Sequence, residues 1–166
     1  MEKYNSEPLT VDYEEVHIVV YKHNMNIVDY QNLITLVQEQ MSFIGYVQSR
    51  EEIDSELKNS MKEGSRAVLF VAYNIDEKVL GFAFGNICCG LETKGDYFWL
   101  NELYVSPKAR NHGLGSMLLR YVQSWSKENG SHYVALVTHP NNKKAQELYQ
   151  QDNFELESLV WVDKYL

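Results

Sequence analysis

A strand-like stretch, a glycine-containing turn and a helix-like stretch follow one another between residues 100 and 116, and this order constrains the fold most. The strand-like residues lead to Pro107, which has no backbone N–H to donate to a sheet. Gly113 and Gly115 come next, and apolar residues then recur at helical spacing. Because glycine permits unusual dihedrals and the first amides of a helix have no intrahelical acceptor, this turn predicts an anion-binding loop.

The loop lacks the two common nucleotide-binding motifs. A dinucleotide site requires G-x-G-x-x-G and a P-loop requires G-x-x-x-x-G-K-[ST], whereas the loop reads Arg110-x-x-Gly113-x-Gly115. Arg110 and His112 would add positive charge beside the amides. Two other interpretations remain: an ordinary glycine turn before a core helix, and a site for another phosphate compound such as a free nucleotide.

Two blocks of the sequence resemble a known family. The run ELYVSPKARNHGLGSMLL, which starts at Glu102, resembles the acetyl-CoA-binding motif [QR]-x-x-G-x-[GA] of the GNAT superfamily of N-acetyltransferases. The run NKKAQELYQQDNF, which starts at Asn142, is similar to the downstream pattern N-x-x-A-x-x-L-Y-x-x-x-G-F. Asn153 replaces the usual glycine, and we expect the same turn because asparagine tolerates the left-handed conformation. The N-terminal half resembles the family only in the order of its elements.

The resemblance implies acetyl-CoA as cosubstrate, and we expect no metal because no spacing of Cys and His residues resembles a metal site. It places the pantetheine arm on exposed strand backbone and the pyrophosphate on the loop amides. By the same resemblance, Asn142 would touch the pantetheine, and Lys143 or Lys144 would lie near the nucleotide end. The implied coenzyme-binding residues are Leu103, Tyr104, Val105, Arg110, Asn111, His112, Gly113, Leu114, Gly115, Ser116, Asn142 and Lys143.

Transfer of an acetyl group from a thioester to an amine requires proton removal from the amine and protonation of the leaving thiolate. Glu102 is the candidate base, because it lies on the strand next to the implied thioester position, on the face opposite Leu103. Asn101 and Tyr104 are its rivals, since one bulge exchanges the faces of a strand. The resemblance makes Tyr149 the general acid. The structural alternatives are a solvated or ion-paired Glu102 and a core Tyr149.

The net charge of −8 argues against a general binder of nucleic acid or of membrane surfaces. The charge is uneven, because residues 107–144 contain six basic residues and a single acidic one. An anionic ligand therefore fits this segment, and a cationic ligand fits the more acidic remainder.

The sequence indicates the charge class of the amine acceptor. Glu92, Asp96 and Glu102 favour a small cationic amine. A protein lysine or N-terminus is the alternative acceptor, and a non-catalytic acyl-CoA-binding regulator is the alternative function. In the resembled family, the connection after the first helix helps to wall the acceptor pocket, so Phe43 and Tyr46 either contact substrate or pack into the core.

Several expectations concern the whole chain. Its 166 residues and 45% hydrophobic content predict one N-acetyltransferase domain over residues 1–166. Cys88 and Cys89 are adjacent and would point to opposite faces of a strand, so we expect no disulfide. The absence of a signal peptide and of a long apolar run predicts a cytoplasmic protein. A terminal edge strand with Leu159 and Trp161 predicts a homodimer through the C-terminus.

The pattern of apolar residues and turn signals predicts an α/β fold. The strands are expected over residues 16–21, 67–73, 78–88, 96–105, 132–138 and 154–165, and the helices from Asn24 or Asn26, near Glu51, at Leu114 and from Asn141 or Asn142. We expect a mixed, mainly antiparallel sheet with helices on both faces. By resemblance, this is a GNAT-like acyl-CoA N-acyltransferase fold with a splayed pair of parallel strands.

Overall fold

The structure is a computed structural model that describes residues 16–23 and 26–166. These residues form two compact units, of which the first ends at Leu136 and the second runs from Val137 to Leu166. Residues 1–15 and the expected helix start at Asn24 lie outside the described residues. The single-domain expectation stays a prediction.

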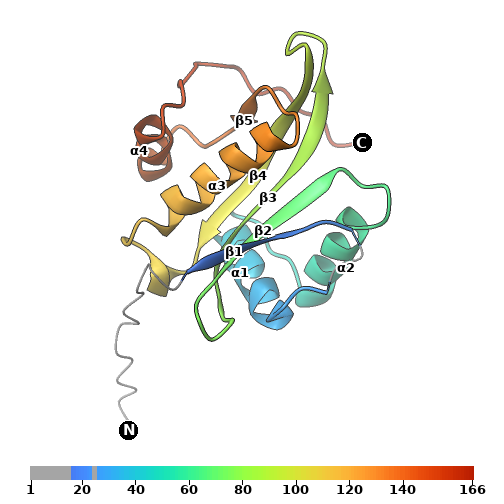
Figure 1. Ribbon diagram of the computed structural model, residues 1–166, viewed down its shortest axis with the longest axis vertical. Coiled ribbons are helices and arrows are strands. Elements are labelled where there is room, and N and C mark those ends of the chain that lie inside the picture. Colours follow the sequence, from blue (N-terminus) through green and yellow to red (C-terminus); the bar gives the residue numbers. More distant parts are fainter. Residues whose placement is uncertain (1–15, 24–25) are drawn as a thin grey trace, which may run out of the picture. The chain divides into compact units, whose positions relative to one another are not determined.

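The first unit contains a five-stranded sheet in the order β1-β2-β3-β4-β5 (Figure 1). The strands are β1 (His17–Tyr21), β2 (Ala67–Tyr73), β3 (Val79–Gly90), β4 (Gly95–Val105) and β5 (Val134–Leu136). The first three pairings are antiparallel and the pairing of β4 with β5 is parallel. The expected mixed sheet with one parallel pair is therefore confirmed.

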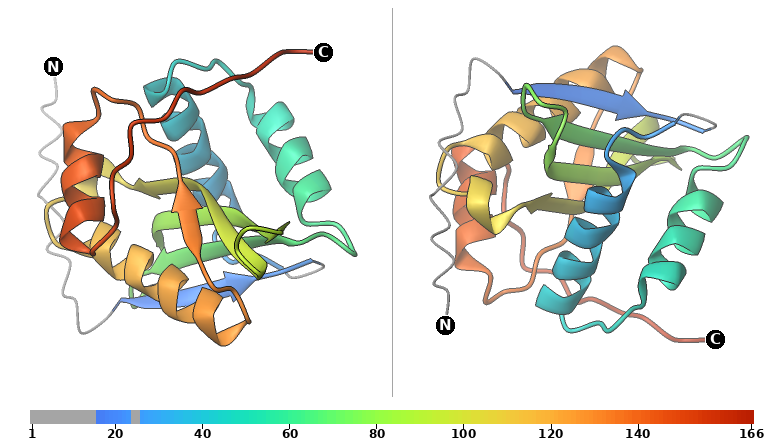
Figure 2. Two further views of the ribbon diagram at one scale, coloured as in Figure 1. Left: turned by 90° about the horizontal axis from the view of Figure 1, so that it is seen from above. Right: turned by 90° about the horizontal axis from the view of Figure 1, so that it is seen from below.

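Helices cover both faces of this sheet (Figure 2). Helix α1 (Tyr30–Phe43) and helix α2 (Arg50–Ser60) lie on one face, where Leu33 and Leu36 pack with Leu69 and Val71 of β2. Helix α3 (Leu114–Glu128) lies on the other face, where the Trp125 ring is 5.3 Å from that of Phe70. Strand β2 is buried on both faces, which explains its uninterrupted apolar sequence.

The first helix begins later than predicted. Helix α1 starts at Tyr30, and Asp29 precedes it with φ 52° instead of lying in its first turn. The Asp29 carboxylate accepts hydrogen bonds from the Val79 amide (3.0 Å) and from the Asn32 side chain (2.8 Å). A tertiary contact to β3 thus fixes this helix start, and the expected start at Asn26 is wrong.

Strand lengths also depart from the expectations. Strands β3 and β4 extend to Gly90 and from Gly95, which shortens the loop expected between them. Strand β5 covers only residues 134–136 of the expected 132–138, and residues 154–166 contain no strand. The apolar pattern of this tail is strand-like, but a strand also requires a hydrogen-bonded neighbour, and the tail has none among the described residues.

The second unit contains helix α4 (Lys143–Gln151). The Asn142 side chain caps it by accepting a hydrogen bond from the Ala145 amide (3.3 Å), as the sequence predicts. Asn153 adopts φ 62° just after the helix, so the expected left-handed turn is confirmed.

Candidate active site

The predicted anion-binding loop connects β4 to α3. A single 3₁₀ turn (Pro107–Ala109) follows the strand, and Gly113 caps the helix with φ 78°. The first backbone hydrogen bond of α3 runs from the Met117 amide to the Gly113 carbonyl (2.9 Å). The amides of residues 114–116 therefore have no acceptor within the helix, in the part of the chain that the structure describes, and they suit an anion.

Arg110 is held against the end of β4. Its Nε donates a hydrogen bond to the Val105 carbonyl (3.0 Å), and its guanidinium lies 5.0 Å from the centre of the Tyr104 ring. These contacts hold a positive charge against the end of β4. Asn111 and His112 are exposed in the same loop, so the loop residues predicted from the sequence are brought together.

A bulge in β4 decides which side chains face the helices. The pairing of β3 with β4 shifts register between Phe84 and Gly85, so that Gly85 pairs with Leu100 and Phe84 pairs with Glu102. Phe98 packs against Trp125 of α3, with ring centres 6.0 Å apart. Glu102 and Tyr104 instead face α1, as do Phe84 and Phe82 opposite them.

Close approach of the two strands explains why glycine occupies position 85. A Cβ atom built on Gly85 would lie 2.4 Å from the carbonyl oxygen of Trp99 and 2.5 Å from the Phe98 ring. No side chain fits there without a shift of the strands.

Glu102 is neither fully solvated nor ion-paired with any described residue. Gln40 of α1 donates a hydrogen bond from Nε2 to its Oε2 atom. Burial raises the pKa of the Glu102 carboxyl to about 7, although the hydrogen bond from Gln40 acts in the opposite direction. A carboxylate with this pKa can both accept and release a proton near neutral pH.

Gln40 is a site residue that the sequence analysis missed. It is only 6% exposed, and its Oε1 atom has no hydrogen-bond partner among the described residues. It lies on the buried side of α1 with Leu33 and Leu36. The signal in the sequence is a polar residue that continues the apolar, core-facing side of the predicted helix.

Tyr104, the rival of Glu102, has a different environment. Its hydroxyl is 3.5 Å from Oε2 of Glu39, and its ring packs near Phe82 and under Arg110. Burial raises its pKa above the ordinary value, and Arg110 opposes that change. The other rival, Asn101, accepts a hydrogen bond from Asn86 (2.8 Å) and is exposed.

The remaining predicted site residues lie in the second unit. Tyr149 is buried and its ring is 5.8 Å from that of Phe154. Asn142 caps α4, and Lys143 Nζ lies 3.3 Å from the Gln146 side-chain oxygen. Because these residues belong to residues 137–166, a joint site with Glu102 stays a prediction.

Phe43 and Tyr46, the candidates for the acceptor pocket, are 66% and 54% exposed. The alternative that they pack into the core is therefore wrong. Their contact with a substrate stays a prediction.

Two searches of the described residues give negative findings. Nowhere in residues 16–23 and 26–166 do three His, Cys, Asp or Glu side chains gather as a group able to hold a metal ion. No helix in those ranges has both the length and the apolar character needed to cross a bilayer. Cys88 and Cys89 are free thiols.

A mixed sheet with one parallel pair, whose fourth strand leads through a glycine turn into a helix, is the arrangement expected for a GNAT-like acyltransferase fold. The sequence model of the acetyltransferase (GNAT) family matches residues 30–154. The chain therefore belongs to the GNAT family, and the expected fold is confirmed.

Relatives and solved structures agree with this assignment. An uncharacterised N-acetyltransferase of Bacillus subtilis is 39% identical over 56 residues, which cover 34% of this chain and 38% of the relative. A D-amino-acid N-acetyltransferase of Saccharomyces cerevisiae is 33% identical over 63 residues, which cover 38% of this chain and 39% of that protein. The chain thus matches less than half the length of either relative.

A solved aminoglycoside acetyltransferase from an uncultured soil metagenomic sample, in complex with sisomicin, has the same fold. Its TM-score is 0.74 at 16% identity, with 92% of this chain and 97% of that chain covered.

Proposed function

We propose that the protein transfers the acetyl group of acetyl-CoA to the primary amine of a small cationic acceptor by direct attack. The observation that carries this proposal is the placement of Glu102. Its carboxyl, with a pKa of about 7, lies on the strand that leads directly into the anion-binding loop. Membership of the GNAT family supports the same chemistry.

The first unit would supply most of the coenzyme contacts. The amides of residues 114–116 and the Arg110 guanidinium would hold its pyrophosphate. Pairing of β4 with β5 ends at Leu100, so the backbone of residues 103–105 would hydrogen-bond the pantetheine arm. Asn142 and Lys143 would contact the pantetheine and the nucleotide. Acetyl-CoA supplies a thioester, whose acetyl carbonyl carbon is the electrophile.

Proton transfer assigns the two catalytic roles. Glu102 would take the proton that the amine must lose, directly or through a water chain, and Gln40 would hold its carboxylate in place. Tyr149 would donate its phenolic proton to the departing thiolate, as the tyrosine of the family motif implies. A phenol with a pKa near 10 is a suitable donor to a thiolate with a pKa near 8.5.

The charge around β4 supports a cationic acceptor, although less strongly than the sequence indicates. Asp96 is ion-paired with Arg66 at 2.5 Å, which neutralises one of the three acidic residues. Glu92 and Glu102 form no ion pair with any described residue. The solved structure named an aminoglycoside acetyltransferase shares the fold, and we take the acceptor in that name as a further reason to propose an amine acceptor.

Incubation with acetyl-CoA and a panel of amines tests the proposal. Free-thiol release with small cationic amines, and a weaker response with peptides that carry lysine or a free N-terminus, is the expected result. Heat on titration with acetyl-CoA without thiol release for any amine indicates the non-catalytic regulator instead. Arg110→Ala should weaken acetyl-CoA binding about tenfold, whereas Lys108→Ala, an exposed cation in the same turn, is the matched control. The cytoplasmic location and the homodimer stay predictions.

A further inference from the structure

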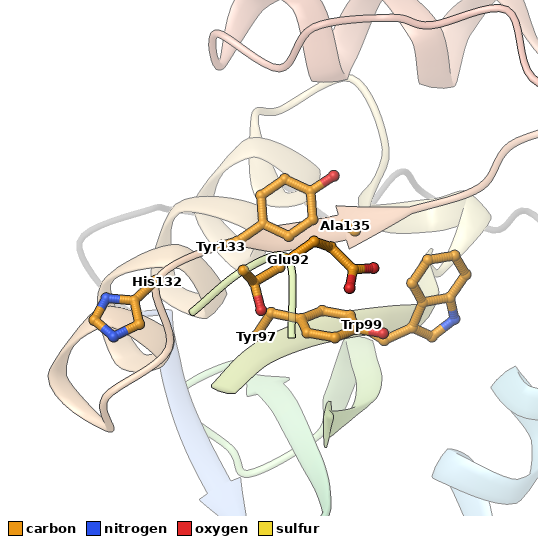
Figure 3. Close-up of a pocket in the computed structure, with 7 residues that line it drawn as sticks. Glu92, Tyr97, Trp99, His132, Tyr133 and Ala135 are labelled. Carbon is orange, nitrogen blue, oxygen red and sulfur yellow. The ribbon is translucent and has the colours of Figure 1, made fainter. Parts of the chain in front are cut away.

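A hollow of about 540 Å³ lies where the turn between β3 and β4 meets the first part of β4 and β5 (Figure 3). It belongs entirely to the first unit, and of its walls the function proposed above uses only the charge of Glu92. The lining residues are Glu92, Thr93, Tyr97, Trp99, His132, Tyr133 and Ala135.

Aromatic rings form most of the walls. The rings of Tyr97 and Tyr133 are 6.1 Å apart and inclined at 53°, so they form an open angle and not a closed stack. Trp99 continues this wall along β4. In the view of Figure 3, the Glu92 carboxylate lies between the Tyr133 ring and the side chains of Tyr97 and Trp99.

This composition suits an organic cation. The faces of tyrosine and tryptophan rings attract ammonium groups, and a carboxylate among them adds a full negative charge. Glu92 forms no ion pair among the described residues, and the Asp96 carboxylate nearby is already paired with Arg66. The pocket thus presents a negative charge that no described side chain neutralises.

The pocket and the proposed base lie on the same face of the sheet. Phe98 packs against α3, so its neighbour Trp99 points to the opposite face, where Glu102 meets α1. Trp99 pairs with Asn86 and Glu102 pairs with Phe84, two positions apart on β3. Trp99 therefore lies about 7 Å from Glu102 along the strand direction. Tyr97 pairs with Cys88, four positions from Phe84, and so lies about 13 Å from Glu102 along the same direction.

We infer that the Glu92–Tyr97–Trp99–Tyr133 pocket binds an alkylammonium group, and that the acceptor carries this second cation about 7–13 Å from the nitrogen that is acetylated. The second part rests on the proposed acetyl transfer. The pocket itself rests only on its rings and its carboxylate. An acceptor with two separated amino groups therefore fits the protein better than a monoamine of the same length.

The test compares α,ω-diaminoalkanes of increasing length with n-alkylamines of the same lengths, by thiol release from acetyl-CoA. The wild type should prefer the diamine by about tenfold in kcat/KM, with the greatest preference at one intermediate length. Glu92→Gln and Tyr133→Leu should each reduce this preference to about twofold or less. Asp76→Asn removes one negative charge in the turn between β2 and β3 and should leave the preference unchanged.

A binding measurement separates the two proposals. Hexyltrimethylammonium has no nitrogen that can be acetylated, and calorimetric titration should show that it binds the wild type about tenfold more tightly than Glu92→Gln. This binding without thiol release from any amine upholds the pocket and overturns acetyl transfer to amines. Thiol release with equal use of diamines and monoamines, together with unchanged affinity in Glu92→Gln, overturns the pocket and upholds the transfer.

Discussion

Gln40 of α1 donates a hydrogen bond to the carboxylate of Glu102 on β4, although 62 residues separate the two in the sequence. The contact joins the first helix to the strand that leads into the predicted anion-binding loop. Gln40 is buried, so its amide has one defined position beside the carboxylate. The orientation of the proposed base is therefore set by a helix that contains none of the family motif residues.

Glu102→Gln should lower kcat/KM about 10²–10⁴-fold at neutral pH, because the amide cannot accept the proton. In the wild type, log kcat/KM should rise with a slope of 1 below about pH 7 and level off above it, since the ionised Glu102 carboxyl, with a pKa of about 7, takes the proton of the amine. In the variant, the slope of 1 should continue through pH 7, because only amine that has already lost its proton to the solvent can react. An identical pH profile in both proteins removes Glu102 from the mechanism.

Glu102 should also make folding stability depend on pH. Its carboxyl pKa is raised in the folded protein from 4.5 to about 7, so the folded state binds the proton more tightly than the unfolded chain. The resulting stabilisation is complete below pH 4.5 and is lost as the pH rises to about 7. Between pH 4.5 and 8, the free energy of unfolding should fall by about 1–2 kcal/mol more in the wild type than in Glu102→Gln. This figure allows for the solvated part of the carboxyl. Urea unfolding of both proteins at the two pH values measures this difference.

Gln40→Leu should raise the pKa of Glu102 further, because it removes the donor that favours the carboxylate. The break in the pH profile should move to higher pH while the plateau rate changes less. Gln38→Leu is the matched control on the same helix, since Gln38 donates to the Gln48 carbonyl (2.9 Å) and not to Glu102. A purely structural role for Gln40 predicts lower stability with an unmoved break.

Gly113→Ala should weaken acetyl-CoA binding and destabilise the protein by about 1 kcal/mol, because alanine is strained at φ 78°. Open space surrounds the position, so the cost is conformational and not steric. Gly45→Ala is a close match, with φ 93° and equally open surroundings between α1 and α2. Unfolding should show similar losses for both variants, and titration should show weaker coenzyme binding for Gly113→Ala alone.

Tyr149→Phe should lower kcat about 10²-fold or more with little change in the affinity for acetyl-CoA, because it removes the proton donor and keeps the ring. The ring contact with Phe154 should survive the substitution, so stability should change little. Tyr121→Phe, on α3 against Phe70, is the control for loss of a tyrosine hydroxyl elsewhere. Equal turnover of Tyr149→Phe and wild type removes the general-acid assignment.

The sequence predicted most of the fold because the deciding signals are local. The apolar run Ala67–Tyr73 has the observed bounds, Gly113 and Asn142 mark two helix starts, and Asn153 adopts the expected turn. The wrong expectations concern elements whose bounds depend on a partner far away in the sequence. The Val79 amide donates a hydrogen bond to the Asp29 carboxylate, and α1 begins only after Asp29. The strand-like tail after Phe154 has no strand to pair with among the described residues.

By itself, the sequence determined what its motifs contain: a glycine turn between β4 and α3, the arginine in that turn, and a carboxylate at position 102. Only the tertiary structure decided what surrounds that carboxylate. The bulge opposite Gly85 turns Glu102 toward α1, and burial beside Gln40 changes its pKa. The physical reason is that a backbone motif depends on neighbouring residues, whereas solvation and pairing of a charge depend on segments that meet only when the chain folds.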